Sequence, residues 1–256
     1  MRQLSADTIT ADSADVFGVE DRVVENVVST LGLQLGGKEH TALVAHGTQE
    51  PAAYDYYLRG RGYLQDYHKA ENVTNAISLF GLALQRDPNY ALAYAGLGQA
   101  YWAKYDATYE REWIEKAAQT CQHSLDLGPD FADGHSCLGA VYTATGRYED
   151  AVLQFQRAVQ IDPTNEGAYR GLASAYEHSG SLAEAEKTYQ LAIKVRLQYW
   201  AGYGWLGSFY SHQAKYKEAP HEFSQAIALA PDDPHGYREL GVFTFTWVIT
   251  AKQSMF

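Results

Sequence analysis

A repeat of 34 residues is the feature that most constrains the fold of this chain. Pro129 and Pro163 lie 34 residues apart, and Pro231 follows after 68 more, which is two further periods. Each proline ends an expected helical run, because proline cannot continue the backbone hydrogen-bond ladder. Pro88 precedes Pro129 by 41 residues, one period plus seven. A period of this length is a repeated supersecondary unit, so the sequence predicts an array of repeats that bury their flanks against one another.

One period, residues 132–163, carries two apolar stripes with helical spacing. Gly146 falls between the stripes, where the chain must reverse its direction. Small residues recur where two helices are expected to cross, because only small side chains allow close approach. The first stripe is His135, Leu138, Gly139 and Tyr142, and the second is Ala151, Phe155 and Ala158. The period therefore predicts a pair of antiparallel helices.

The same stripes return along the chain, with two irregular units. The regular copies are Tyr169, Leu172, Ala173, Tyr176, Ala185, Tyr189 and Ala192, and then Tyr203, Leu206, Gly207, Tyr210, Ala219, Phe223 and Ala226. In the unit that opens with Tyr94, we expect the seven extra residues in the turn between its helices, around residues 105–111. In the first unit, counting back from Ala76 puts Gly60 at the leading aromatic position, and only Tyr67 agrees with the pattern.

These residues resemble the tetratricopeptide repeat (TPR), whose pattern is W-x2-L-G-x2-Y…A-x3-F…P. The resemblance covers residues 52–246 and implies an all-α solenoid of antiparallel helix pairs, wound as a right-handed superhelix with a concave inner face. We expect residues 1–50 to form an N-terminal helical capping or linker segment and residues 51–256 to form the array. The array has five full repeats and a partial sixth, at about 54–90, 91–131, 132–165, 166–199, 200–233 and 234–256.

The two ends of the chain and one proline give further expectations. A stripe of valines from Val16 to Val28 predicts an amphipathic helix with Ser13 as its N-cap and Gly32 as its end, followed by a shorter helix at 38–46. Pro220 falls inside an expected helix at 216–229 and is tolerated there only in or near the first turn. Residues 241–250 lose the repeat pattern, so we expect the natural array to continue and the unfinished end to allow association with another copy.

A second resemblance concerns the first hundred residues. The segments at 15–24, 53–61, 75–80 and 87–94 are similar to the C-terminal regions of bacterial membrane-anchored serine/threonine kinases, winged-helix transcription regulators and class III adenylate cyclases. In those proteins such a segment joins an upstream domain to a TPR array. The sequence carries no kinase glycine-rich loop, no His-Arg-Asp loop and no basic recognition helix. The resemblance therefore implies a regulatory or sensor region of a larger signalling enzyme or transcription regulator.

Charge and hydropathy exclude several classes of partner. The formal net charge is −11, and an acidic surface repels phosphate backbones, so we expect no nucleic-acid partner. No apolar run approaches the ~20 residues that a membrane-spanning helix needs. The N-terminal residues show no secretory signal. We therefore expect a cytoplasmic protein, or an extracytoplasmic one if the chain belongs to a membrane-anchored parent.

Motifs that carry catalytic or metal chemistry are incomplete. Residues 32–39 nearly spell a phosphate-binding loop, but Glu39 replaces the Ser or Thr that binds magnesium, and the segment follows an expected helix instead of a strand. The nine histidines never pair at metal-ligand spacing. We expect no enzyme activity, no cofactor and no metal, and interpret the chain as a module that binds proteins or peptides.

The resemblance to TPR proteins also supplies a candidate site. In that family the first helix of each pair lines the inner face, through residues one and five beyond the leading aromatic and residues near the helix end. Here Trp102 can act as an aromatic anchor, while Arg170 and Arg238 can bind carboxylates. The Lys and Asn set of members that bind chaperone tails is missing. The candidate peptide-binding residues are Gln99, Trp102, Ser136, Arg170, Ser174, His178, Ser208, His212 and Arg238.

Overall fold

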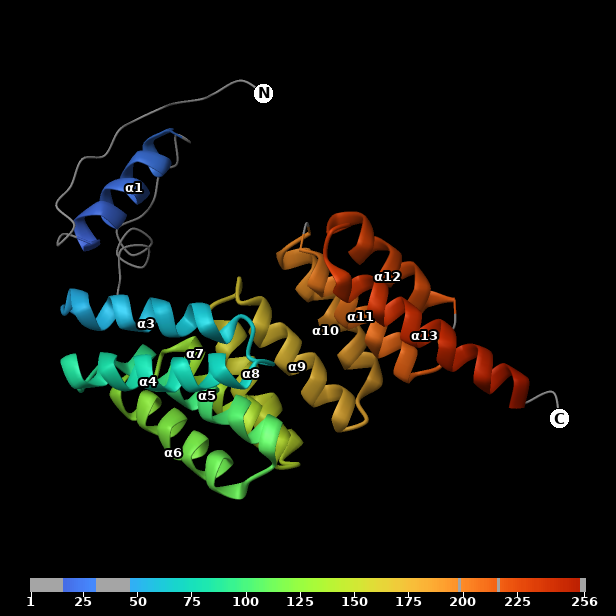
Figure 1. Ribbon diagram of the computed structural model, residues 1–256, viewed down its shortest axis with the longest axis horizontal. Coiled ribbons are helices and arrows are strands. Elements are labelled where there is room, and N and C mark those ends of the chain that lie inside the picture. Colours follow the sequence, from blue (N-terminus) through green and yellow to red (C-terminus); the bar gives the residue numbers. More distant parts are fainter. Residues whose placement is uncertain (1–15, 31–46, 198, 216, 254–256) are drawn as a thin grey trace. The chain divides into compact units, whose positions relative to one another are not determined.

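The computed structural model describes residues 16–30, 47–197, 199–215 and 217–253, and every regular element in that part of the chain is a helix (Figure 1). Helix α1 (Val16–Thr30) lies where the valine stripe predicts it. Its expected cap Ser13, its expected end Gly32 and the short helix expected at 38–46 fall outside the described residues. The prediction of an all-α fold is confirmed.

In the described part of the chain, the remaining helices form five consecutive antiparallel pairs, and the unpaired α13 follows them. They are α3 (Pro51–Leu64), α4 (Ala70–Arg86), α5 (Ala91–Thr108), α6 (Arg111–Leu127), α7 (Ala132–Ala144), α8 (Tyr148–Ile161), α9 (Glu166–His178), α10 (Leu182–Val195), α11 (Trp200–His212), α12 (Glu218–Leu229) and α13 (Pro234–Gln253). Each first helix packs against its own second helix, and α3, α7, α9 and α11 also contact the next first helix, α5, α9, α11 and α13 respectively. The pairing predicted from the 34-residue period is confirmed.

The helices gather into two compact units, residues 1–129 and residues 130–256. The first unit contains the pairs α3–α4 and α5–α6, and the second contains α7–α8, α9–α10, α11–α12 and α13. Each unit has its own buried core. The right-handed superhelix that the TPR resemblance implies stays a prediction.

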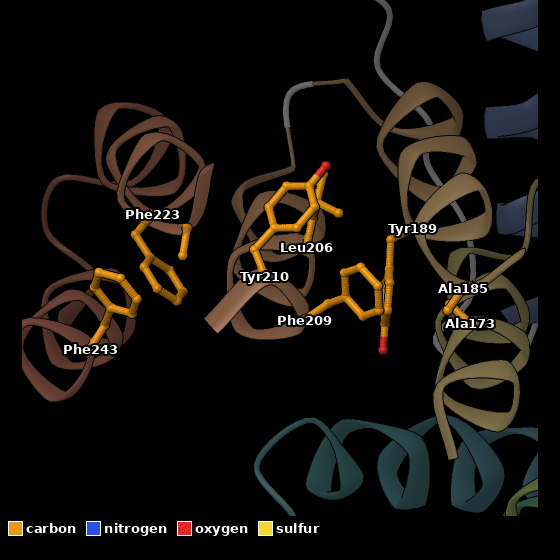
Figure 2. Close-up of a cluster of buried hydrophobic side chains, with 9 residues drawn as sticks. Ala173, Ala185, Tyr189, Leu206, Phe209, Tyr210, Phe223 and Phe243 are labelled. Carbon is orange, nitrogen blue, oxygen red and sulfur yellow. The ribbon is translucent and has the colours of Figure 1, made fainter. Parts of the chain in front are cut away.

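Within each unit, a phenylalanine of the second helix lies against glycines of two first helices. Phe155 on α8 packs so closely that a Cβ added to Gly139 or Gly171 would lie 2.8 Å or 2.2 Å from its ring. Contacts below 3.0 Å are not tolerated, so only glycine leaves room for the ring at these positions. The phenylalanine therefore joins one repeat to the next as well as closing its own helix pair. Figure 2 shows a neighbouring buried cluster across α10, α11, α12 and α13, in which Tyr189 packs against Phe209 and Phe223 packs against Phe243.

The predicted register of the first helix pair is wrong. A Cβ on Gly60 would lie 2.8 Å from the ring of Phe80, so Gly60 occupies the glycine position and not the leading aromatic position. The first-helix glycine precedes the phenylalanine by 20 residues here but by 16 in the pair that contains Gly139 and Phe155. The turn between α3 and α4 is longer, residues 65–69, and α4 begins earlier relative to Phe80. Counting back by a fixed spacing therefore moves the first helix out of register.

The position of the seven extra residues is also corrected. They do not lie in a long turn, because only residues 109–110 separate α5 from α6. Instead α5 has 18 residues against 13 in α7, and α6 has 17 against 14 in α8. The lengthened end is held by Trp113, whose ring lies 4.0 Å from Lys104 Nζ and 4.4 Å from Lys116 Nζ. These cation–π contacts and the 2.7 Å hydrogen bond from Trp113 Nε1–H to Glu110 make two more helical turns favourable.

Two of the prolines that mark the period, Pro88 and Pro163, directly follow aspartates that stabilise the turns between successive helix pairs. The carboxylate of Asp87 accepts a hydrogen bond from the backbone N–H of Asn89 at 2.9 Å, and Asp162 accepts one from Thr164 at the same distance. An aspartate that bonds the backbone two residues on stabilises such a turn locally. Pro220 is the third residue of α12, in its first turn as predicted, so its missing donor leaves no broken helical bond.

Turns between paired helices require a left-handed backbone at one residue. Gly146 and Gly180 have φ values of 76° and 81°, which confirms the chain reversal predicted at Gly146. One period further on, Ala214 adopts the same conformation with φ of 54°. A residue with a Cβ is strained there, whereas glycine is not.

We expect the Ala214→Gly variant to be more stable than the wild type by about 0.5–1 kcal/mol, because it removes this strain. The matched variant Gly180→Ala should lose about 1 kcal/mol. A Cβ at Gly180 meets no atom within 4 Å, so only the backbone conformation is tested. Urea denaturation monitored by circular dichroism measures both changes. Equal effects of the two substitutions in the same direction would contradict this account.

In the described residues, no helix combines the length and the apolar character needed to cross a membrane. Residues 241–250, where the repeat pattern is lost, continue α13 as a helix. Its described side chains include Phe243, which packs against Phe223 with ring centroids 6.3 Å apart.

Candidate functional site

The nine candidate residues divide between the two units. Gln99 and Trp102 lie on α5 of the first unit, and both are half-buried. The ring of Trp102 already packs at 5.9 Å against Tyr67, which follows α3. The second unit holds the other seven, which are Ser136, Arg170, Ser174, His178, Ser208, His212 and Arg238.

Five of these seven residues lie on α9 and α11, two helices that contact each other. We call the surface that these five residues form the first-helix face. On α9, Arg170, Ser174 and His178 follow at intervals of four residues, and on α11 the same interval separates Ser208 and His212. Residues four apart lie one above the other on a helix. Since α9 and α11 pack together, the structure brings these five side chains to neighbouring helices.

At the N-terminal end of the first-helix face, Arg170 lies over an aromatic ring. Its guanidinium carbon is 5.2 Å from the ring centroid of Trp205, which projects from α11. Trp205 in turn meets Tyr199 edge-on at 6.2 Å. Arg196 lies 4.7 Å above the Tyr199 ring and forms a 3.0 Å ion pair with Glu166 at the start of α9.

The aromatic contacts continue to α13. Tyr199 packs against Trp200 at 6.1 Å, and Trp200 stacks on His235 at 5.6 Å with an interplanar angle of 25°. We call Trp205, Tyr199, Trp200 and His235 the aromatic ladder. The ladder was not predicted from the sequence. A signal was present, because Trp205 precedes His212 by seven residues, which is two helical turns, and therefore shares its face.

At the C-terminal end of the face, Glu177 joins three helices. Its Oε1 accepts a 2.9 Å hydrogen bond from His212 Nδ1–H on α11, and its Oε2 accepts one of 3.2 Å from the hydroxyl of Tyr189 on α10. Burial alone would raise the pKa of Glu177, but the bonds from His212 and Tyr189 outweigh it, so that pKa lies below its ordinary value. The bond to Glu177 raises the pKa of His212, and the charge of Glu239 on α13 adds to this.

The remaining candidate residues have separate surroundings. His178 donates from Nδ1 to the carbonyl oxygen of Ser174 at 2.8 Å, and its ring packs 5.6 Å from Tyr148 on α8. Ser136 is half-buried on α7. Arg238 is exposed on α13 with Glu239 at 3.3 Å. The pKa of Asp233 lies below its ordinary value, mainly because the backbone N–H of His235 donates to its carboxylate. The charge of Arg238 adds a smaller lowering, so Arg238 is near this end of the aromatic ladder.

The Glu177–His212 pair predicts a pH dependence of stability. The raised pKa of His212 contributes stability that is complete below about pH 6.5 and is lost as the pH rises through that pKa. The lowered pKa of Glu177 contributes stability above about pH 4.5 that is lost as the pH falls through it. The pair therefore stabilises the protein most between these two values.

We expect the wild type to lose about 0.5 kcal/mol more than the His212→Gln variant between about pH 6 and pH 8, a small effect because the His212 side chain is 68 % exposed. Urea midpoints at the two pH values measure it. His221→Gln on α12, an exposed histidine, serves as the control and should keep the wild-type profile. Parallel profiles for wild type and His212→Gln would rule out the pair as the cause.

In the described ranges, no group of three or more His, Cys, Asp or Glu side chains is arranged to hold a metal ion. What the first-helix face offers chemically is one exposed guanidinium, aromatic rings, small hydroxyl side chains and imidazoles. Such a set supports binding through ion pairs, stacking and hydrogen bonds.

Comparison with known families gives two matches, both to the same repeat. Residues 139–180 match the family described as "TPR repeat", and residues 167–199 match the one described as "Tetratricopeptide repeat". Both matches lie in the second unit and together they include the whole of α9 and α10.

Solved structures show the same fold at low sequence identity. A thermophilic TPR protein of Thermus thermophilus is 18 % identical, with a TM-score of 0.64 over 74 % of this chain and 99 % of that one. PilF of Pseudomonas aeruginosa is also 18 % identical, with a TM-score of 0.54 over 75 % of this chain and 85 % of that one. These similarities concern the fold alone.

Two curated proteins are distant relatives. The small glutamine-rich tetratricopeptide repeat-containing protein 2 of Mycosarcoma maydis is 29 % identical over 99 residues, 38 % of this chain and 26 % of that protein. The putative adenylate cyclase 3 of Rhizobium meliloti is 24 % identical over 140 residues, 54 % of this chain and 24 % of that protein. The chain thus spans about a quarter of the length of these two relatives.

Proposed function

Because the chain is a tetratricopeptide-repeat protein, we propose that it is a non-catalytic interaction module whose first-helix face binds an extended peptide or a segment of a partner protein. Repeat proteins of this kind serve as scaffolds for other proteins, and stacked helix pairs create extended concave surfaces for the purpose. Gln99 and Trp102 on α5 are candidate binding residues of the first unit by itself. No cofactor or metal takes part.

The observation that carries the proposal is Arg170. Its side chain is exposed, its guanidinium lies over Trp205, and the residues beside it on the face are small. Arg and Trp are enriched among the residues that dominate binding energy at interfaces. A guanidinium held by a ring loses less conformational freedom on binding than one in solvent.

A selection from a random peptide library tests the proposal. Peptides selected on the wild type are measured against Arg170→Ala combined with Arg238→Ala, and against a control that combines Arg157→Ala with Arg111→Ala. The control arginines are exposed on α8 and α6, two helices that carry none of the candidate residues. We expect a loss of about tenfold or more in the site variant, as for a charge-assisted bond, and no change in the control. Unchanged affinity in the site variant would remove the proposed site.

A second proposal concerns the parent protein. The similarity to an adenylate cyclase over 140 residues, together with the short share of that relative that this chain covers, favours a regulatory or sensor region of a larger signalling enzyme or transcription regulator. The reading frames that flank the coding segment distinguish this regulatory region from an interaction module that acts on its own. An in-frame cyclase, kinase or winged-helix domain would select the regulatory role, and binding by the first-helix face would then serve that domain.

Self-association through the C-terminal end stays a prediction. Tyr237 on α13 and Leu229 on α12 are exposed apolar side chains near that end. Light scattering coupled to size-exclusion chromatography should detect a concentration-dependent dimer if this surface pairs with another copy. A constant monomer mass over a wide concentration range would contradict this.

A further inference from the structure

We propose that the aromatic ladder and Arg170 recognise a peptide segment in which an acidic side chain stands within three residues of an aromatic one. The inference rests on the proposed function and deepens it, since it names the chemistry of the ligand. It uses Arg170, Trp205, Tyr199 and Trp200, and only the first of these four was predicted from the sequence.

The second unit contains five arginines, all in its described part, and Arg170 differs from the other four. Arg147, Arg157, Arg196 and Arg238 each lie within 3.3 Å of a carboxylate oxygen, at 2.6, 2.7, 3.0 and 3.3 Å. Among the described residues Arg170 has no such ion pair, and its guanidinium contacts the Trp205 ring instead.

Among the described arginines of the second unit, Arg170 alone lacks an ion pair, on a chain with 31 acidic and 20 basic residues. Carboxylates are abundant in this protein, yet Glu166, one helical turn away on α9, is bound to Arg196. The guanidinium of Arg170 therefore keeps its N–H donors available for a ligand. A guanidinium binds a carboxylate through two parallel hydrogen bonds, which makes an acidic side chain the best complement.

The surface next to Arg170 is apolar and aromatic. Tyr199 and Trp200 are half-buried, and Leu197 beside them is 61 % exposed. Of the charged groups that border this surface, Arg196 forms an ion pair with Glu166, and the carboxylate of Asp233 is hydrogen-bonded by the backbone N–H and the ring of His235. A flat aromatic side chain of the ligand can therefore pack on these rings without stripping water from an unpaired charge. Contacts between aromatic rings also contribute binding energy beyond that of the buried surface area.

The distances limit the spacing in the ligand. The centroid of Trp205 is 5.2 Å from the guanidinium of Arg170 and 6.2 Å from the centroid of Tyr199. The guanidinium of Arg170 and the ring of Tyr199 are therefore at most about 11 Å apart, a span that three extended residues cover. A ligand with the two groups farther apart in sequence would have to loop out between them.

Single-stranded nucleic acid also pairs anionic groups with stacking bases. The net charge of −11 disfavours it, because the phosphates would be repelled by most of the surface. A peptide carries only the one or two charges that Arg170 can neutralise. We therefore commit to the peptide and include a short oligonucleotide as a test.

Fluorescence anisotropy with dye-labelled peptides tests the inference. Three peptides share a Gly/Ser background: one has Asp and Trp two residues apart, one has Asn in place of Asp, and one has Ala in place of Trp. On the wild type we expect the Asp/Trp peptide to bind about tenfold more tightly than either of the others. A poly-dT oligonucleotide of similar length should bind more weakly than this peptide.

Variants assign each subsite. In Arg170→Gln the preference for Asp over Asn should disappear while the preference for Trp over Ala remains. In Tyr199→Ala the opposite result is expected. Arg157→Gln on α8, also exposed, should keep both preferences, and circular dichroism checks that all variants are folded.

Three results would overturn the inference: no binding of the Asp/Trp peptide at about 1 mM, an Asp preference that survives Arg170→Gln, or tighter binding of the oligonucleotide. These results are distinct from failure of the proposed function. If the random-library selection yields peptides that depend on Arg170 but lack the acidic–aromatic pair, the interaction module stands and its ligand chemistry is different.

Discussion

The Phe80→Ala variant should lose about 3–5 kcal/mol of unfolding free energy, the largest effect we expect from a single substitution in this chain. The ring is fully buried and lies against first helices of two successive pairs, at Gly60 on α3 and Gly96 on α5. Removing it opens a cavity that touches α3, α4 and α5 together. Glycine backbones on both sides have no side chains that can move in to fill it.

Leu82→Ala is the matched control for Phe80→Ala. Leu82 lies two residues along the same helix and is 38 % exposed, so its truncation should cost less than about 1 kcal/mol. Phe80→Leu keeps part of the volume and should fall between the two. Urea denaturation followed by circular dichroism gives the three free energies. Equal losses for Phe80→Ala and Leu82→Ala would contradict the role assigned to the ring.

The regular part of the fold could be predicted because the same pattern of apolar and small residues recurs several times at a constant period. A single stripe such as that of Tyr142 or Phe155 is compatible with many helical folds. The same stripe at a constant period fixes which helix pairs with which, and the glycine φ of 76° at residue 146 follows from the reversal that the period demands. The helix pairs and the turn were therefore correctly predicted.

The predictions for the two irregular helix pairs were wrong because they assumed a fixed spacing between repeat positions. Insertions in repeat proteins are absorbed wherever packing allows, and here α5 and α6 grow instead of the turn because Trp113 and its lysines stabilise the longer pair. The glycines Gly60 and Gly96 were not assigned to the packing of Phe80. Their role depends on the distance between two helices, which spacing along the sequence does not contain.

The sequence predicted which positions belong to the candidate site. It did not predict the contacts that those side chains make with residues of the neighbouring helix. Arg170 and His212 were both selected from their place in the repeat. The sequence does not show that Arg170 lies over Trp205 or that His212 donates to Glu177. Both contacts cross from α9 to α11, so they depend on side-chain directions between helices from different repeats.

The second large effect concerns a glycine that no spacing rule singled out. Gly171→Ala on α9 should destabilise the protein by about 1–3 kcal/mol, since the new Cβ would lie 2.2 Å from the Phe155 ring. The gain in helix propensity of about 1 kcal/mol offsets only part of this cost. Gly204→Ala on α11 is the matched control, because its Cβ would meet Trp200 at an ordinary 3.9 Å. That substitution should stabilise by about 0.5–1 kcal/mol.

The two glycine substitutions are therefore expected to have opposite signs, although both place alanine within a first helix. A compensating change identifies the cause. In a Phe155→Leu background the smaller side chain leaves room for the new methyl group, so Gly171→Ala should cost less there than in the wild type, with a coupling of about 1 kcal/mol. Thermal and urea denaturation of the four proteins in this cycle give the coupling. Additive effects would mean that Phe155 does not limit residue 171, and that glycine is present there for a reason other than the contact between successive repeats.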